Sequence, residues 1–146
     1  MQLPGRVLIG FIEGGNVYLF KNPNFNNVEH EHYHVVVNHD PQNEDTIILV
    51  NATSQIEKRK MWVSKNKLPK ETLIEVGHTE CPFLSKDTVF DCNNKTLFTK
   101  DDLVDLTDSM ALQYIEKVPY DLLKKIRAGL IASPMIEGYI KEMLKD

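Results

Sequence analysis

The stretch from His30 to Ser54, HEHYHVVVNHDPQNEDTIILVNATS, decides the fold that the sequence predicts. It holds two apolar runs rich in β-branched residues, Tyr33 to Val37 and Thr46 to Val50, and a segment of turn-forming residues, HDPQNED, separates them. We therefore expect two antiparallel strands joined as a hairpin. In such a hairpin the residues before the first strand lie beside the residues after the second.

Polar side chains gather at that end of the predicted hairpin. Three histidines enter the first strand, and one amide and two hydroxyls follow the second: His30, His32, His34, Asn51, Thr53 and Ser54. Alternation along a strand puts the three imidazoles on one face. Imidazoles suit acid–base chemistry near neutral pH, and hydroxyls can donate to phosphate oxygens. The alternative is structural: the histidines are polar strand-edge residues, and the Asn, Thr and Ser side chains end the strand by bonding their own backbone.

A basic segment begins four residues after Ser54. Lys58 to Lys70 (KRKMWVSKNKLPK) holds six Lys or Arg and no Asp or Glu, whereas the rest of the chain has 11 basic and 21 acidic residues. A net charge of −4 argues against a general nucleic-acid binder, but a concentrated positive segment beside the candidate site can hold a phosphate backbone. The plainer interpretation is a solvated surface loop. As candidate RNA- and phosphate-binding residues we take Lys58, Arg59, Lys60 and Asn51.

A metal site is a further alternative. The HxHxH pattern of His30, His32 and His34 can present imidazoles to a metal ion, and His78 or Cys81 from the GHTECPF segment could add a ligand. The spacing matches no known zinc motif, and the cysteines are not paired as CxxC. P-loop and GxSxG motifs do not occur. We therefore expect a site without metal or cofactor.

The size and composition are those of one domain. A chain of 146 residues with 42% hydrophobic and 26% charged residues is long enough for its own core and is typical of a soluble protein. No apolar run approaches the roughly 18 residues that span a bilayer, and the N-terminus lacks the pattern of a signal peptide. We expect a cytoplasmic protein in which Cys81 and Cys92 are reduced thiols.

Outside the hairpin, the pattern predicts further short strands. We expect them at Arg6 to Ile12, Asn16 to Phe20, Met61 to Val63, Thr72 to Val76 and Thr88 to Asp91. The first two would form a hairpin through Glu13-Gly14-Gly15.

After Phe98 the apolar period changes from two to about 3.6, which predicts helices. One would cover Lys100 to Leu106 after an N-cap at Thr99, a second would start at Pro119, and a third would follow Ser133-Pro134. In the last helix the residues expected to face inward are Ile136, Tyr139, Ile140 and Leu144. The predicted fold is α+β, mainly β, with one domain over residues 1–146. A small, strongly bent antiparallel barrel would occupy residues 6–98, and two or three helices within 99–146 would pack on it.

Two motifs in this chain resemble a known family. His34-Val35-Val36-Val37, then an acidic and polar turn, then Asn51-Ala52-Thr53-Ser54 on a small β domain resemble the MazF/PemK-like toxins, and ToxN-type relatives share this plan. The later part of the chain, with GHTECPF, SKDTVFD and a helical tail, resembles uncharacterised bacterial proteins near that family. The resemblance covers residues 6–91 in the order of elements. It implies an SH3-like barrel that cuts RNA without a metal ion.

The resemblance also implies a mechanism, in which the RNA 2′-hydroxyl attacks its own phosphate while a cation and a hydroxyl stabilise and position it. The hydroxyl role falls to Thr53, with Ser54 beside it. The arginine that the family usually has just before the Val-rich strand is absent, and His32 and His34 stand there instead. We therefore expect a metal-independent endoribonuclease of the toxin–antitoxin type acting on single-stranded RNA, with His34, His32, Thr53 and Ser54 as catalytic residues.

The expected partners are RNA, an antitoxin protein and a second copy of the chain, and not a membrane. The alternative from another class is a non-catalytic small-barrel module that binds a protein partner or a nucleic acid. Its histidines would be engaged in structural hydrogen bonds.

Overall fold

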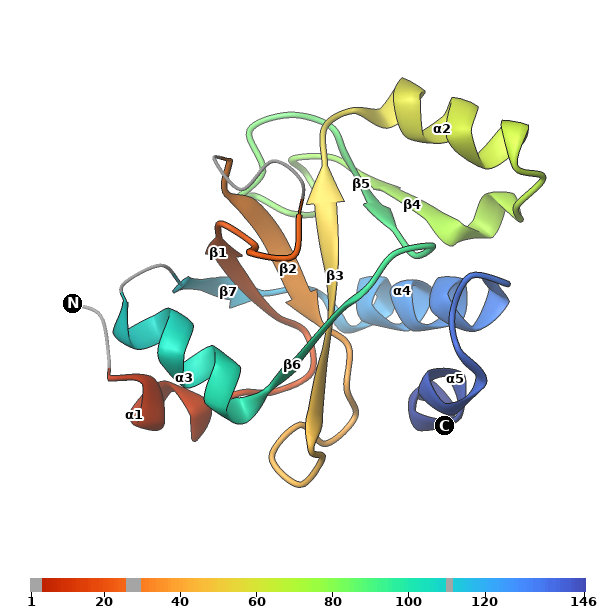
Figure 1. Ribbon diagram of the computed structural model, residues 1–146. Coiled ribbons are helices and arrows are strands. Elements are labelled where there is room, and N and C mark those ends of the chain that lie inside the picture. Colours follow the sequence, from red (N-terminus) through yellow and green to blue (C-terminus); the bar gives the residue numbers. More distant parts are fainter. Residues whose placement is uncertain (1–3, 26–29, 110–111) are drawn as a thin grey trace.

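The computed structural model describes residues 4–25, 30–109 and 112–146. They form an α+β fold with a mostly antiparallel sheet of seven strands and helices around it (Figure 1). The strands are β1 (Asn16–Phe20), β2 (His32–Val36), β3 (Thr46–Thr53), β4 (Leu73–Val76), β5 (Thr88–Asp91), β6 (Thr96–Thr99) and β7 (Leu112–Lys117). The helices are α1 (Gly5–Ile9), α2 (Ile56–Lys65), α3 (Lys100–Asp108), α4 (Tyr120–Ala132) and α5 (Gly138–Leu144), with a 3-10 turn η1 (Lys70–Thr72).

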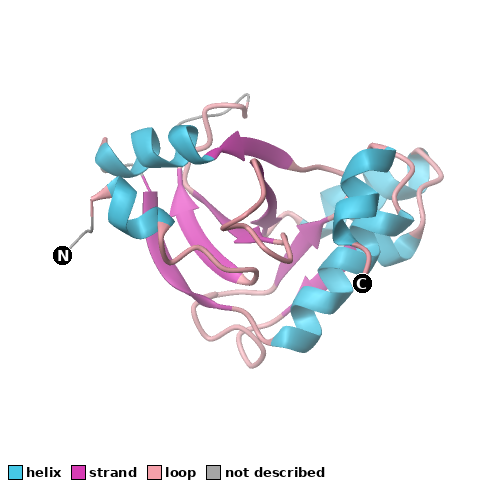
Figure 2. Cartoon of the chain, turned by 90° about the horizontal axis from the view of Figure 1, so that it is seen from below, coloured by secondary structure: helices cyan, strands magenta, loops and turns pink. Residues whose placement is uncertain are grey.

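Strand β3 is the centre of the sheet. The strand order is β4-β5-β3-β2-β1-β7, and β6 pairs with the first half of β3 while β5 pairs with its end. The predicted hairpin is confirmed, because Val35 lies opposite Val50 in the β2–β3 pair. Figure 2 shows the strands curving around with helices at opposite ends. Among the described residues β4 and β7 do not pair with each other, so the curved sheet is not closed into a barrel.

Both faces of β3 are buried. Ile48 and Val50 belong to a core that includes residues of α4 and α5, whereas Ile47 and Leu49 belong to a second core that includes Leu103 of α3. In Figure 1 the helix pair α1 and α3 lies on one side of β3, and α4 and α5 lie on the other. A strand buried on both faces has a continuous apolar run instead of an alternating one, which is the pattern seen from Thr46 to Val50.

The strand predicted at Arg6 to Ile12 is wrong, because this segment begins with helix α1. Short apolar runs do not distinguish strand from helix by periodicity, and the tertiary contacts decide here. The Gly5 N–H donates to Asp108 Oδ1 at 2.8 Å, and a Cβ on Gly5 would lie 2.7 Å from the Val104 carbonyl oxygen. Strand β1 therefore pairs with β2 and β7 instead of forming the predicted hairpin.

The strand predicted at Met61 to Val63 is also wrong, since these residues lie in helix α2. Their neighbours are mostly Glu, Lys and Arg, which are good helix formers and outweigh a β signal of three residues. Strands β6 and β7 are not predicted by the sequence pattern. Strand β7 lies within the segment expected to be helical and pairs with β1.

The predicted helix starting after Thr99 is confirmed, with a full capping box between Thr99 and Asp102. Helix α4 follows Pro119 as expected. The last helix begins at Gly138, later than predicted, and Tyr139 is 59% exposed instead of buried, whereas Ile136, Ile140 and Leu144 are buried. None of the described helices is both long enough and apolar enough to cross a membrane.

Candidate functional site

Two adjoining hollows lie where β2 begins and β3 ends. The first, which we call the Arg59 hollow, has a volume of about 410 Å³, and the second, the Lys58 hollow, has a volume of about 540 Å³. His32, Thr53 and Gln55 line both of them. The Arg59 hollow is completed by Asn24, Phe25, Asn51, Arg59, Asp91, Asn94, Lys95 and Thr96. Ser54, Lys58 and Lys86 are among the polar residues that line the Lys58 hollow, together with His30.

The strand register explains why these side chains meet. His34 of β2 lies opposite Asn51 of β3. His32 is two residues before His34 and Thr53 two residues after Asn51, so all four side chains lie on one face of the sheet. The sequence-based expectation that these two strand ends meet is confirmed.

His34 lines neither hollow and is fully buried beneath them. Its Nδ1–H donates to the His32 carbonyl oxygen at 2.9 Å, and its Nε2 accepts from Asn22 Nδ2 at 3.1 Å. The imidazole also stacks on Phe20, with 4.0 Å between ring centroids. Burial lowers the pKa of His34 to about 3. The ring is therefore neutral at physiological pH, and both its nitrogens are used inside the protein.

His32 is half-buried and faces both hollows. Its Nδ1 atom is buried and has no hydrogen-bond partner among the residues that the structure describes. The edge of its ring meets Phe25 at 5.1 Å between centroids. A buried polar atom without a partner costs about 1–3 kcal/mol, so such atoms are rare in folded proteins, and a catalytic role is one explanation for them.

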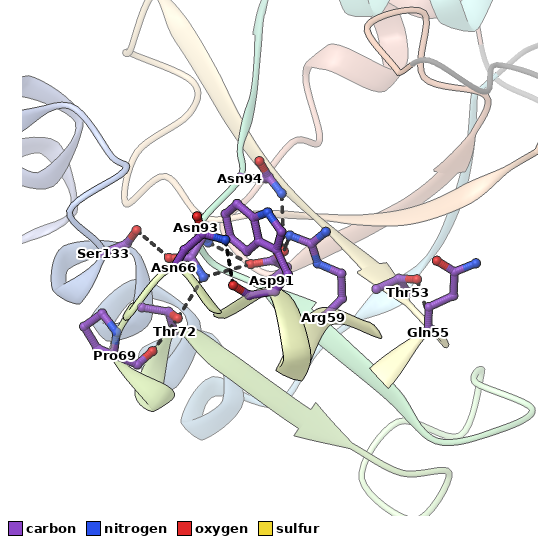
Figure 3. A network of polar contacts seen from close by, with 11 residues as sticks. Thr53, Gln55, Arg59, Asn66, Pro69, Thr72, Asp91, Asn93, Asn94 and Ser133 are labelled. Carbon is purple, nitrogen blue, oxygen red and sulfur yellow. Dashed lines mark hydrogen bonds and ion pairs between the residues drawn. The ribbon is translucent and has the colours of Figure 1, made fainter. Parts of the chain in front are cut away.

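Arg59 extends from α2 toward the end of β5. Its Nη2 atom lies 2.5 Å from Asp91 Oδ2, and its guanidinium lies over Trp62 at 4.6 Å from the ring centroid. Its Nε is the second buried nitrogen without a partner in the described part of the chain. Figure 3 shows the guanidinium turned toward Asp91, with Thr53 and Gln55 drawn nearby at the end of β3. The helix thus brings a cation to the hollow that His32 and Thr53 line.

Asp91 is held by a polar network that extends into the protein. Its side chain is 3% exposed and accepts from the Asn93 backbone N–H at 3.0 Å and from Asn94 Nδ2 at 3.3 Å. Asn93 in turn bonds Thr72 and Ser133, so β5, η1 and the end of α4 fix one carboxylate (Figure 3). A buried charge needs such a pair and such hydrogen bonds to be stable.

The other predicted residues divide between the two hollows. The Thr53 hydroxyl oxygen accepts a hydrogen bond from the Gln55 backbone N–H at 3.2 Å, which stabilises the turn after β3. The hydroxyl proton of Thr53 remains available for donation to a ligand. Ser54 and Lys58 line the Lys58 hollow and are exposed. Lys60 lines neither hollow, and its Nζ pairs with Glu75 at 3.2 Å.

Sequence reasoning missed the contribution of β5. The register that places Ala52 opposite Phe90 brings Asp91 to the level of Asn51. A signal was present, because the strand Thr88–Asp91 is followed by polar residues just as β3 is. Without knowing that β5 pairs with β3, that likeness could not place Asp91 in the site.

The cysteines and His78 lie outside both hollows. Burial raises the pKa of Cys81 to about 11 and raises that of Cys92 further, so both thiols stay protonated. His78 Nδ1 bonds the Leu84 carbonyl oxygen at 2.7 Å. Within residues 4–25, 30–109 and 112–146, no group of three or more His, Cys, Asp or Glu side chains is arranged to hold a metal ion.

No protein-family model matches this chain, and no curated protein matches it significantly.

Proposed function

We propose that this protein is a metal-independent endoribonuclease of the toxin–antitoxin type that acts on single-stranded RNA. The observation that carries the proposal is that His32, Asn51, Thr53 and Arg59 line one hollow at the edge of the sheet. These side chains offer an acid–base group, a hydroxyl donor, an amide and a cation, which are the groups that phosphodiester cleavage needs.

In the proposed reaction the scissile phosphate lies against His32 and Thr53, between the two hollows. The His32 imidazole takes the proton of the 2′-hydroxyl, a bond forms between that oxygen and phosphorus, and the bond from phosphorus to the 5′-oxygen breaks. The leaving 5′-oxygen receives the proton from the imidazolium. The Thr53 hydroxyl and the Arg59 guanidinium stabilise the charge on the phosphate oxygens.

Arg59 takes the role that the family gives to an arginine before the Val-rich strand. It belongs to α2, which follows β3 directly, yet it lines the same hollow as His32. His34 receives a positioning role in this proposal, because its Nδ1–H holds the carbonyl group of His32. The likeness to the SH3-like toxin barrels also stays part of the proposal, with the curved sheet as an open form of that plan.

The test is cleavage of a long end-labelled RNA in excess EDTA. We expect cleavage by the wild type and a loss of at least about 100-fold for His32→Ala, because general acid–base catalysis contributes typically 10²–10⁴-fold. Thr53→Ala and Arg59→Lys should each lower the rate less. His39→Ala and Thr79→Ala, which change residues outside both hollows, are the matched controls. Cleavage that persists in His32→Ala would overturn the assignment of the acid–base group.

A second candidate function, a non-catalytic module that binds a nucleic acid or a protein such as an antitoxin, is favoured by one observation. The Arg59 guanidinium is already bound to Asp91 and stacked on Trp62. These contacts limit its movement toward the phosphate as negative charge develops there during the reaction. This candidate predicts that RNA binds without turnover. RNA that stays intact at high protein concentration but still binds the protein would support the non-catalytic module. A second copy of the chain is a candidate partner under both proposed functions.

A further inference from the structure

We infer that the Arg59 hollow binds a nucleobase of the strand whose phosphate lies at His32 and Thr53, so that the site takes a base-bearing strand and not a bare phosphate backbone. The inference rests on the proposed function and specifies the substrate of the same site.

The first observation is a group of free carboxamides. The side-chain amides of Asn24, Asn51 and Gln55 line the Arg59 hollow, and none of them bonds another residue in the described part of the chain. Each carboxamide offers both a donor and an acceptor. Nucleobase edges display donors and acceptors side by side, and Asn and Gln are the side chains that pair with them in a bidentate way. A bare phosphate would use only the donor half of each amide.

The second observation is an aromatic wall. Phe25 is half-buried, lines the same hollow and meets the edge of His32. Its ring is held from inside the protein by His34, with 5.6 Å between centroids and 29° between planes. Unstacked bases of a single strand bind on aromatic side chains that are fixed in this way.

The third observation is the distribution of charge between the two hollows. In the Arg59 hollow each cation has an acidic partner, because Arg59 pairs with Asp91 and Lys95 pairs with Glu137 at 2.8 Å. Arg59 can therefore serve the one phosphate at the border with the Lys58 hollow, but among its described residues the Arg59 hollow holds no unpaired cation for a second phosphate. In the Lys58 hollow, which Glu31 also lines, Lys58 and Lys86 form no ion pair with any described residue. An uncharged ring therefore fits the Arg59 hollow, and a flanking phosphate fits the Lys58 hollow.

The experiment compares strands of equal phosphate number with and without bases. The probes are four fluorescent 2′-O-methyl homohexanucleotides, one for each base, and a hexamer of the same length that is abasic throughout. The 2′-O-methyl group blocks the proposed attack, so the dissociation constants report binding alone. We expect the wild type to bind at least one base-bearing hexamer about tenfold more tightly than the abasic hexamer, since stacking on an aromatic side chain contributes at this level.

The variants are Phe25→Leu, which keeps an apolar side chain of similar reach without the ring, and the double variant Asn24→Ala with Gln55→Ala. Each should reduce the advantage of the base-bearing hexamer to about twofold while leaving the affinity for the abasic hexamer unchanged. Asn43→Ala, which removes an exposed carboxamide in the β2–β3 turn, is the matched control. Thermal unfolding of each variant shows that the fold is retained.

The inference is overturned if the wild type binds all five hexamers within about twofold of one another, or binds none of them. It is also overturned if the variants weaken binding of the abasic hexamer as much as binding of the base-bearing hexamers, since the side chains would then contact the sugar-phosphate backbone. A preference for a base-bearing hexamer over the abasic hexamer, without cleavage of unmodified RNA, supports the inference and rejects catalysis. Cleavage of unmodified RNA without that preference supports catalysis and rejects the inference.

Discussion

The Nη2 atom of Arg59 in α2 lies 2.5 Å from the Oδ2 atom of Asp91 at the end of β5. Helix α2 buries one apolar side chain, that of Val63, so this ion pair is a main connection between the helix and the sheet. The same contact sets the position of the Arg59 guanidinium beside His32 and Thr53. The pair therefore links the stability of the α2 segment to the geometry of the proposed phosphate site.

Asp91→Asn should destabilise the protein by about 3 kcal/mol, because removing one partner of a buried ion pair leaves the other charge uncompensated. Urea unfolding of the wild type and the variant measures this difference. Lys60→Gln, which removes the exposed pair with Glu75, is the control and should change the free energy of unfolding by less than about 1 kcal/mol.

Arg59→Gln combined with Asp91→Asn should recover part of the stability that Asp91→Asn loses, since neither charge is then left alone. If the double variant loses more free energy of unfolding than the two single variants lose together, the pair is not the stabilising contact.

His34 should make the stability pH-dependent in the acid range. Its pKa is about 3 in the folded protein and about 6.5 when the chain is unfolded, so between these values the unfolded state binds a proton that the folded state does not. The contribution of His34 to the free energy of unfolding is thus constant above about pH 6.5. As the pH falls from about 6.5 toward about 3, this contribution lowers the free energy of unfolding by about 1 kcal/mol per pH unit.

The check is the free energy of unfolding from pH 8 to pH 4 for the wild type and His34→Phe. The variant should be less stable at neutral pH, because Asn22 loses a partner, yet it should lose less stability on acidification. Thr79→Ala, at an exposed position without an ionisable group, should retain the wild-type slope. Equal slopes for the wild type and His34→Phe would contradict a buried, neutral His34.

Gly129→Ala should destabilise helix α4, although alanine is the better helix former by about 1 kcal/mol. A Cβ at position 129 would lie 2.8 Å from Cys92 Sγ and 3.0 Å from the Glu71 carbonyl oxygen, so the helix would have to move away from β5 and η1. Thermal unfolding of Gly129→Ala and of Gly129→Ala with Cys92→Ala measures the effect. The second change should restore part of the loss, and a stabilised Gly129→Ala would show that this close packing is absent.

The sequence predicted those parts of the fold whose local signals and tertiary contacts agree. The β2–β3 hairpin, the strand ending at Asp91 and the capped helix after Thr99 belong to this group, since turn residues, β-branched runs and an N-cap residue all point the same way. The segments after Pro4 and around Met61 were predicted wrongly, because short apolar runs fit strand and helix equally. The packing of Gly5 and Val63 decides that these segments are helical.

Half of the site followed from the sequence for a similar reason. His32, Asn51 and Thr53 belong to two strands adjacent in the chain, and period-two alternation places them together. Asp91 and Lys95 come from a strand and a turn far along the chain, and only the β3–β5 pairing brings them to the hollow. The burial of His34 could not be foreseen either, since alternation assigns a face but not the depth of the covering layer.

The chemical ends of the cleaved RNA test the central claim most directly. A long unmodified RNA is incubated with the protein in excess EDTA, and the fragments are analysed by mass spectrometry. Attack by the 2′-hydroxyl on its own phosphate predicts 2′,3′-cyclic phosphate ends and 5′-hydroxyl ends, which His32→Ala does not produce. Intact RNA, or fragments with 5′-phosphate and 3′-hydroxyl ends, would contradict the proposed reaction.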